Sequence, residues 1–480
     1  MVGDAELPDF PTPVVVTDKR GRSKWLVSIP PETPFPLEPS AYAEICVKNY
    51  EVAAHVAALH AHAHKEHAAH YDYYHVDPYF MDVGEAEAHG LLPGTKGRAT
   101  VHQDAVVGEE QVPMQAEVCE KSMTFVMETV DAGLGKTLLM LWTAYGLAQK
   151  EGRAFFVDDS RWAYGKYTSY FHPPPMPKCR PPPRHQMLPC PHHARHLIVS
   201  TATVRSTFGG AFNEYYEDPR KMEVYRLKPI FQFARQGYEA LFKLSSADDD
   251  YVSGRVDVLK NQTEIPAPKE GNGMIIGLHV RRGDRHPYEF QYSDSYVPLD
   301  RYSDKARELL QTAYKSGGSE NMAAEMHSLM VVASDDPDVY LSEEFSHAVR
   351  AQDFIALASK SPSAPASGDH APIRRFVEEA VGWEGGFFSG MFWSLGRTSV
   401  PGTAATHVPP TEAALHLREL VGRAYLLDLA VLGRVSDKLV CTVSAMGCRL
   451  LGVMMGWDHA IVEKGWVNID GDFDWRGVSW

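Results

Sequence analysis

The sequence predicts an α/β protein with two parallel strand–helix–strand units that follow an N-terminal helical and irregular region. Short apolar runs of the length expected for buried strands occur at 124–127 and 154–157, and again at 274–280 and 329–333. A helical pattern separates the members of each pair, and the polar stretch 260–272 between the pairs is typical of a linker. Because parallel α/β units bind ligands beyond the carboxyl ends of their strands, we expect a nucleotide site in a cleft between two lobes.

The N-terminal region is assigned to residues 1–112. It has a proline-rich opening and a helical stretch from about residue 39 to residue 69, followed by glycine-containing turns. The first α/β lobe is assigned to residues 113–268, where a turn at 131–135 precedes an apolar helix at 137–150.

Nine prolines between Pro173 and Pro191 predict an extended loop, because proline fixes φ and lacks a backbone donor. The second lobe is assigned to residues 269–480. It combines a helix at 302–315 with a strand-then-helix pattern at 439–455.

The composition is ordinary for a globular protein, with 44% hydrophobic and 23% charged residues. Lys and Arg number 47 against 62 Asp and Glu, so the net charge is −15. We therefore expect no broad binding to nucleic acid or anionic membrane, while a local basic pocket for a phosphate is compatible with this charge. No membrane segment is expected, because Arg449 interrupts the best apolar run at 439–457, and the first six residues lack a signal-peptide pattern.

The six cysteines are too sparse for a disulfide-built scaffold. Cys179 and Cys190 bracket the proline-rich loop and have three interpretations: a disulfide bond, two free thiols, or a zinc site completed by nearby histidines. The proline-rich surroundings favour the disulfide bond, and the compartment stays open. The histidines of the zinc alternative are His192, His193 and His196.

The most informative segment is a buried strand that runs into His279-Val-Arg-Arg-Gly-Asp284. Arginines at a strand end suit a diphosphate, because the guanidinium fork matches phosphate oxygens in pairs. Gly283 would let the backbone approach a ligand closely. The alternative is a surface turn with salt-bridged arginines.

Two further strand ends favour the ligand site. Ser334-Asp335-Asp336-Pro337 and Cys441-Thr-Val-Ser444 both follow apolar strands of the same expected sheet. The second opens a helix whose N-terminal amides favour a phosphate. Each alone resembles a capping motif, but together they describe one ligand-binding edge.

These strand ends resemble the motifs of the α-1,6-fucosyltransferases that modify N-glycan cores, and of their relatives that act on chitin oligosaccharides. The resemblance covers about residues 115–455 and suggests a divergent, fungal-type member. In the second lobe it is carried by His279–Asp284 with Glu289 further on, by Asp335-Asp336-Pro337, and by Cys441–Ser444 with Cys448-Arg449. In the first lobe it is carried by Gly133-Leu-Gly135, Trp162-Ala-Tyr164 and Cys179.

The resemblance implies a two-lobed GT-B-like fold with Rossmann-like domains, the first lobe on the acceptor side. It also implies an inverting transfer of fucose from GDP-fucose to a glycan or glycoprotein acceptor, with no metal or other cofactor, in the secretory pathway (Golgi). Arg281 and Arg282 would hold the diphosphate and offset charge on the leaving group. Glu289 would be the general base, with Arg285 keeping its carboxylate ionised.

Further donor contacts are implied on both lobes. His279 and Asp428 would lie near the guanosine, and Gly133, Gly135 and Tyr164 would close over the donor. The remaining implied donor-site residues are Lys136, Asp284, Asp335, Asp336 and Ser444. A protein O-fucosyltransferase, another GDP-sugar transferase, and a non-catalytic glycan- or nucleotide-binding homologue are the alternatives.

This sequence departs from the family at three places. Gly283 replaces the usual Thr, four extra residues separate Glu289 from Tyr302, and Ala445-Met446 replaces a Ser-Gln pair. We therefore expect the acceptor site and some donor contacts to differ from those of the family.

Other motifs point to metals or ATP and are discounted. Gly135-Lys136-Thr137 lacks the first glycine of a P-loop, since position 130 is Val. The seven histidines between His55 and His75 are interpreted as a solvated helix. Asp248–Asp250 and Asp470-Gly-Asp472 are interpreted as acidic surface turns, because neither follows a strand of the α/β units.

The glycine- and aromatic-rich run Gly382–Trp393 is either an acceptor-sugar platform or a core loop.

Overall fold

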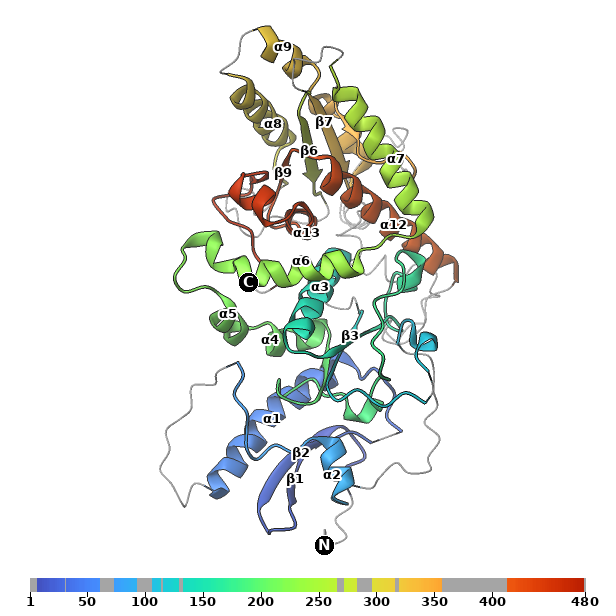
Figure 1. The fold of residues 1–480 in the computed structure, drawn as a ribbon, viewed down its shortest axis with the longest axis vertical. Helices are drawn as coiled ribbons and strands as arrows, with labels where there is room; N and C mark the ends of the chain where they lie inside the picture. Colours follow the sequence, from blue (N-terminus) through green and yellow to red (C-terminus); the bar gives the residue numbers. More distant parts are fainter. Residues whose placement is uncertain are drawn as a thin grey trace, which may run out of the picture.

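The computed structural model describes residues 7–30, 32–60, 73–92, 106–113, 115–128, 133–265, 272–282, 296–315, 319–355 and 412–478. Along the long axis of the molecule, an N-terminal hairpin and helix are followed by two separate parallel sheets with their helices (Figure 1). The structure is therefore a mixed α/β protein with parallel sheets, as predicted.

The N-terminal region contains an antiparallel hairpin that the sequence interpretation left out. Strands β1 (Thr12–Thr17) and β2 (Ser23–Ser28) pair along their whole length. The signal was a β-branched run in β1, followed by a turn in which Asp18 Oδ1 accepts the backbone N–H groups of Arg20 and Arg22 at 2.8 and 2.9 Å. Helix α1 packs on this hairpin. The helices of the region are α1 (Pro39–His60) and α2 (Val83–Ala88).

Helix α1 does not carry a histidine cluster within the described residues. It ends at His60, and the predicted continuation to residue 69 lies outside the described ranges. His60 Nε2 lies 2.9 Å from the Ser23 carbonyl, and its ring stacks on Tyr79 with centroids 4.3 Å apart. This histidine therefore joins α1 to the hairpin.

The first sheet is three-stranded and parallel in the order β4-β3-β5. The predicted strand–helix–strand unit is confirmed, but strand β5 and helix α7 were missed. The strands are β3 (Ser122–Val126), β4 (Ala154–Asp158) and β5 (His196–Val199). The helices are α3 (Leu134–Lys150), α4 (Val204–Thr207), α5 (Gly210–Tyr216), α6 (Lys228–Leu241) and α7 (Ser246–Thr263).

Helices α3 and α6 cross with their backbones in direct contact. A Cβ on Gly146 would lie 2.3 Å from the Phe233 carbonyl oxygen, and a Cβ on Gly237 would lie 2.1 Å from that of Trp142. Only glycine fits at either position without moving the other helix. On its other side, α6 places Phe231 against Trp457 and Trp475, which lie in the second half of the chain.

The second sheet has five parallel strands in the order β10-β9-β6-β7-β8. The chain runs outward from β6 to β8 on one side and later returns to β9 and β10 on the other. The direction of winding therefore reverses between β6 and β9. The strands are β6 (Ile275–Val280), β7 (Leu329–Ser334), β8 (Val349–Arg350), β9 (Lys438–Cys441) and β10 (Trp466–Asn468).

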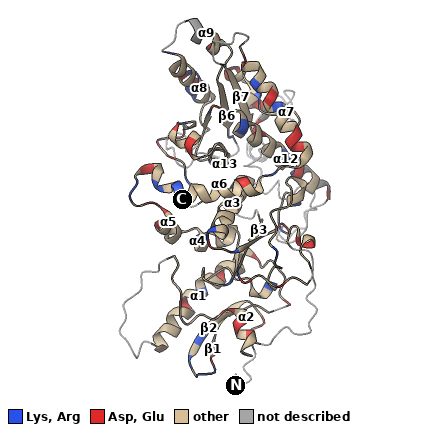
Figure 2. Cartoon of the chain, viewed as in Figure 1, with Lys and Arg blue, Asp and Glu red and all other residues tan. Residues whose placement is uncertain are grey.

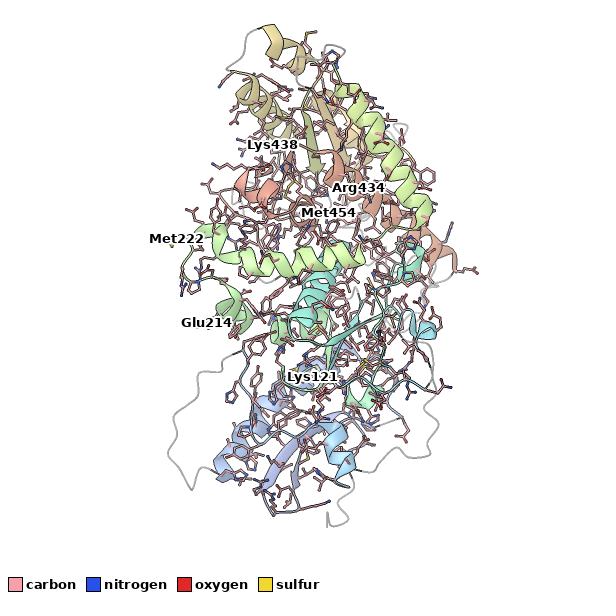
Figure 3. The ribbon with its side chains drawn as sticks, in the orientation of Figure 1. Lys121, Glu214, Met222, Arg434, Lys438 and Met454 are labelled. Atoms are coloured by element: carbon pink, nitrogen blue, oxygen red, sulfur yellow. A yellow bond between two sulfur atoms is a disulfide. The ribbon has the colours of Figure 1, made fainter. Side chains whose placement is uncertain are left out.

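Helices cover both faces of this sheet (Figure 1). Odd-numbered residues of β6, such as Ile275, belong to the core shared with α12, while even-numbered ones, such as Leu278, pack with Tyr302 of α8. The helices are α8 (Leu299–Tyr314), α9 (Ser319–Met326), α12 (Glu412–Val435) and α13 (Met446–Met455). Helix α13 also touches α6, where Arg235 donates to the Val453 carbonyl at 2.9 Å, next to Met454 (Figure 3).

The Asp248–Asp250 segment is not the predicted surface turn but lies in α7, directly after its first residues. Asp248 is buried and accepts hydrogen bonds from Arg423 Nε of α12 at 2.9 and 3.0 Å. Asp249 pairs with Arg434, at the end of α12 (Figure 3). The acidic run therefore clamps α7 to α12, which explains its composition without a metal.

All six cysteines form disulfide bonds: Cys46–Cys190, Cys119–Cys179 and Cys441–Cys448. The predicted Cys179–Cys190 bond is therefore wrong, and the zinc alternative is excluded because both sulfurs are already bonded. The prediction failed because the true partners lie 144 and 60 residues away in the sequence. Cys46–Cys190 ties the N-terminal region to the first sheet.

Acidic and basic residues are interspersed along the described helices (Figure 2). No described helix is long and apolar enough to cross a membrane.

Peptide mapping under non-reducing conditions should recover Cys46 linked to Cys190, and Cys119 linked to Cys179. Replacing Cys46 and Cys190 together by Ser should lower the free energy of unfolding by about 2–5 kcal/mol, because a long loop is no longer closed in the unfolded chain. Urea denaturation measures this loss. A recovered Cys179–Cys190 peptide would contradict the assignment.

Candidate functional site

The ends of β6 and β7 are joined by a buried ion pair. The register aligns Val280 with Ser334, so the next residues, Arg281 and Asp335, stand opposite each other. Arg281 Nη1 donates to Asp335 Oδ2 at 2.7 Å, and both side chains are 3% exposed or less. The other carboxylate oxygen, Asp335 Oδ1, accepts the backbone N–H of Arg282 at 2.8 Å. Asp335 therefore fixes the point where the chain leaves β6.

Arg282 is placed differently from Arg281. It is half-buried, and its guanidinium lies 5.1 Å from the centroid of the Tyr296 ring. Its Nε is buried and has no hydrogen-bond partner among the described residues. A buried charged donor of this kind is costly unless an acceptor reaches it. A ligand oxygen at the end of β6 would supply one.

On the α8 face of the sheet, two hydroxyl groups lie beside Arg282. Tyr302 and Thr442 are fully buried, and neither hydroxyl has a well-aligned hydrogen bond to a described residue. Burial raises the pKa of Tyr302, and the neighbouring Thr442 hydroxyl and Arg282 guanidinium act in the opposite direction. These groups gather where β6 and β9 end side by side, which is the reversal point of the sheet.

On the α12 face, His279 and Asp428 are both buried. Burial lowers the pKa of His279 to about 4, while Asp335 favours the charged form and Arg281 disfavours it. The imidazole is therefore neutral at pH 7. Burial also raises the pKa of Asp428 well above its usual range, partly offset by Gln352, whose Nε2 lies 3.5 Å from Asp428 Oδ2. Both residues lie on one face of the sheet, and their predicted guanosine contacts stay predictions.

The turn from β9 to α13 completes the edge. Helix α13 begins at Met446 with Ala445 as its N-cap, two residues later than the predicted start at Ser444. Ser444 is partly exposed within the turn. The Cys441–Cys448 disulfide bond closes the short loop that contains Ser444. Helix α13 thus begins shortly after the end of β9, the strand that pairs with β6, and the N-terminus of a helix favours an anion.

Two of the residues predicted to close over the donor, Gly135 and Tyr164, lie against helices α12 and α13 or α12 alone. A Cβ on Gly135 would lie 2.8 Å from Met446 Cβ and 2.8 Å from the Tyr425 hydroxyl, so the start of α3 abuts α12 and α13. Tyr164 is buried, and a Cβ on Gly422 of α12 would lie 2.8 Å from its ring. Gly133 is the N-cap of α3, and Lys136 is partly exposed in its first turn.

The other predicted residues divide into two groups. Asp336 accepts the backbone N–H of Asp338 at 2.9 Å and caps a short 3-10 helix (Pro337–Leu341), as the capping alternative proposes. Gly283, Asp284, Arg285 and Glu289 lie outside the residues that the structure describes, as does the run Gly382–Trp393.

The sequence patterns do not predict the roles of two residues at the carboxyl end of β10, Asn468 and Asp470. Asp470 is fully buried and follows β10, so the interpretation of Asp470–Asp472 as a turn unconnected to a strand is wrong. Asn468, the last residue of β10, holds the β9–α13 turn. Strand β10 has only three residues, which is too short for a periodic signal.

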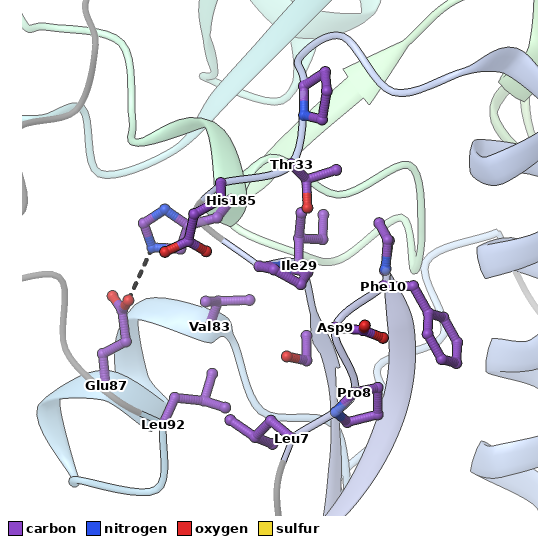
Figure 4. A pocket seen from close by; sticks show the side chains of 15 residues that line it. Leu7, Pro8, Asp9, Phe10, Ile29, Thr33, Val83, Glu87, Leu92 and His185 are labelled. Carbon is purple, nitrogen blue, oxygen red and sulfur yellow. Dashed lines mark hydrogen bonds and ion pairs between the residues drawn. The ribbon is translucent and has the colours of Figure 1, made fainter.

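A separate cavity of about 570 Å³ lies between the hairpin, α2 and the 3-10 helix Arg184–Gln186 (Figure 4). Its wall includes His185, whose Nε2 lies 2.8 Å from Glu87 Oε1. None of the residues that line it belongs to β6, β7 or β9, so it is not part of the strand-end site.

Comparisons with known proteins give matches among solved structures but none by sequence. No family model matches the sequence, and a search of curated proteins finds no relative. Among solved structures, the chain is similar to NodZ α-1,6-fucosyltransferase soaked with GDP-fucose, with 13% identity and a TM-score of 0.34 over 70% of this chain and 92% of that one. For fucosyltransferase NodZ from Bradyrhizobium the values are 13%, 0.35, 69% and 92%. Values this low leave the site and the reaction to be decided by the residues themselves.

The two arginines should respond differently to substitution. Arg281→Ala leaves the Asp335 carboxylate buried without its partner, and should lower the free energy of unfolding by about 3–5 kcal/mol. Arg281→Lys should recover little of this loss, since lysine lacks the guanidinium fork. Arg282→Ala removes a half-buried side chain and should cost about 1 kcal/mol or less. Urea denaturation of the three variants tests this, and equal losses for Arg281→Ala and Arg282→Ala would contradict it.

His279 should make stability depend on pH. Its folded-state pKa of about 4 lies below the unfolded value of 6.5, so its contribution is complete above pH 6.5 and is lost as the pH falls toward 4. His279→Gln should reduce the change in unfolding free energy over this window by about 3 kcal/mol. A residual slope is expected from His196, whose pKa burial also lowers to about 4. Identical pH profiles for variant and wild type would refute the assignment.

Proposed function

We propose that this protein transfers fucose from GDP-fucose to a hydroxyl group of a glycan or glycoprotein acceptor. The observation that carries the proposal is the convergence of Arg282, Thr442 and the start of α13 at the point where the strand order reverses. Reversal of the winding direction leaves a crevice for a ligand outside the carboxyl ends of the strands. An arginine donor and helix amides on its two sides suit a diphosphate.

The nucleotide and the sugar are proposed from the ordered set of strand-end motifs. His279–Asp284, Asp335–Pro337 and Cys441–Ser444 resemble, in this order along the chain, the motifs of GDP-fucose enzymes. With them we propose the two-lobed GT-B-like arrangement, in which residues 113–268 face the acceptor and residues 269–480 hold the donor.

The two arginines divide the work at the diphosphate in this proposal. Arg282 contacts the phosphate oxygens and offsets the charge that develops on the leaving group. Arg281 acts through Asp335, which fixes the backbone of Arg282. With this positive charge and the start of α13 in place, the transfer needs no metal. The reaction inverts the sugar, and Glu289 removes the proton of the acceptor hydroxyl.

The disulfide bonds support a location for this reaction. All six cysteines are paired, and two of the bonds join segments that are far apart in the sequence. Such bonds persist in oxidising compartments and are rare in the cytosol. We therefore propose that the protein works in the secretory pathway.

GDP and GDP-fucose should raise the melting temperature, because a ligand that binds only the folded state stabilises it, whereas ATP and UDP-sugars should have no effect. Arg282→Ala should abolish the shift. The matched control is Arg307→Ala on α8, which removes an exposed arginine paired with Asp304 and should keep the shift. A response to ATP or UDP-sugars but not to GDP would overturn the proposed donor. Activity that EDTA abolishes and a metal restores would overturn the metal-free mechanism.

Glu289→Gln should reduce kcat by about 100-fold or more and leave the affinity for GDP-fucose nearly unchanged, because a general base acts on the acceptor in the transition state. Single-turnover kinetics and donor titration measure the two quantities separately. Unchanged turnover would transfer the role to another carboxylate, with Asp284 the next candidate. Joint loss of binding and turnover would instead make Glu289 a support of the donor pocket.

A further inference from the structure

Asn468 links the end of β10 to the β9–α13 turn through its side-chain amide. Its Oδ1 accepts the backbone N–H groups of Val443 at 2.8 Å and of Asp470 at 3.1 Å. Its Nδ2 faces three carbonyl oxygens, those of Asp470, Gly471 and Phe473, at 3.0 to 3.1 Å. One side chain therefore satisfies both the turn after β9 and the loop after β10.

Val443 is held from its other side by Arg449. The buried guanidinium donates through Nε to the Val443 carbonyl at 2.8 Å, and through Nη1 to the Gly477 carbonyl at 3.1 Å. Both backbone polar groups of Val443 are thus bound by side chains, not by a neighbouring strand. The conformation of this residue is set by Asn468 and Arg449 together.

This arrangement fixes where the turn delivers the start of α13. Val443 lies between Thr442 and Ser444. The backbone carbonyl of Thr442 accepts the backbone N–H of Ala445 at 3.0 Å. A shift of the Val443 peptide would therefore move the Thr442 hydroxyl and the first-turn amides of α13 together.

We propose that Asn468 is a positioning residue for a nucleoside diphosphate: by holding Val443 it sets the donors of the β9–α13 turn at the spacing that the phosphates require. The inference rests on the proposed function, since it concerns the same site. Asn468 itself does not contact the ligand. It acts through the backbone of the turn.

The test compares Asn468→Ala with Asn49→Ala in the full chain. Asn49 of α1 is the control, because its side-chain amide also donates to a backbone carbonyl, that of Cys190 at 3.0 Å; Asn49 is buried, whereas Asn468 is partly buried. Two readouts are needed: amide hydrogen exchange of the peptide covering 442–447 without ligand, and the Kd for GDP. For Asn468→Ala we expect about ten-fold faster exchange in this peptide and about ten-fold weaker GDP binding. For Asn49→Ala we expect a lower melting temperature with both readouts unchanged.

Four other outcomes would overturn either this proposal or the proposed function. Unchanged exchange at 442–447 in Asn468→Ala would overturn the proposal, as would faster exchange with an unchanged Kd. Equal weakening of GDP binding in both variants would also overturn it, because the loss would then follow general destabilisation. If the wild-type protein does not bind GDP while exchange still rises in Asn468→Ala alone, the proposed function fails and the control of the turn by Asn468 stands.

Discussion

The structure of the candidate site depends on the ion pair between Arg281 and Asp335. Each charge alone would be buried at a cost of several kcal/mol, so the two groups are stable inside the protein only together. Their pairing requires that β6 and β7 end at the same level, which the register provides. Asp335 also accepts the backbone N–H of Arg282. The alignment of β6 and β7 therefore determines where the half-buried guanidinium of Arg282 lies. The direction in which the chain leaves β6 follows from this.

The remaining supports of the site come from both halves of the chain. Helix α12 carries Asp428 on one side, and Arg423, bound to Asp248 of α7, on another. The start of α3 contacts α12 and α13 through Gly135, where any side chain would collide. Helix α6 then bridges α3 and α13, through the glycine contact on one side and Arg235 on the other. The carboxyl ends of the second sheet's strands are therefore supported by helices that pack with the first sheet as well as by those that pack with the second.

Much of this could be predicted from the sequence, and the misses have physical causes. Strands β3, β4, β6, β7 and β9 and helix α3 are apolar runs whose period and length identify them. Cysteine pairing was mispredicted because it depends on which distant segments meet, and a spacing pattern carries no information about that. Asn468 and Asp470 escaped because β10 has only three residues. The sequence did identify Arg281, Arg282 and Asp335 as members of one edge, but it gave no sign that Arg281 would be turned inward onto Asp335.

The order of strands in the second sheet has a consequence for synthesis. Strand β6 lies between β7, which soon follows it along the chain, and β9, which comes only after the whole of α12. During synthesis, the edge of β6 that pairs with β9 has no partner strand until the ribosome has released the segment that contains β9. Until then the backbone groups of this apolar edge are not paired by β9. Contacts between distant segments form slowly, and open strand edges invite aggregation. The interval between completion of β7 and arrival of β9 is therefore the stage at which β6 is most open to wrong pairing.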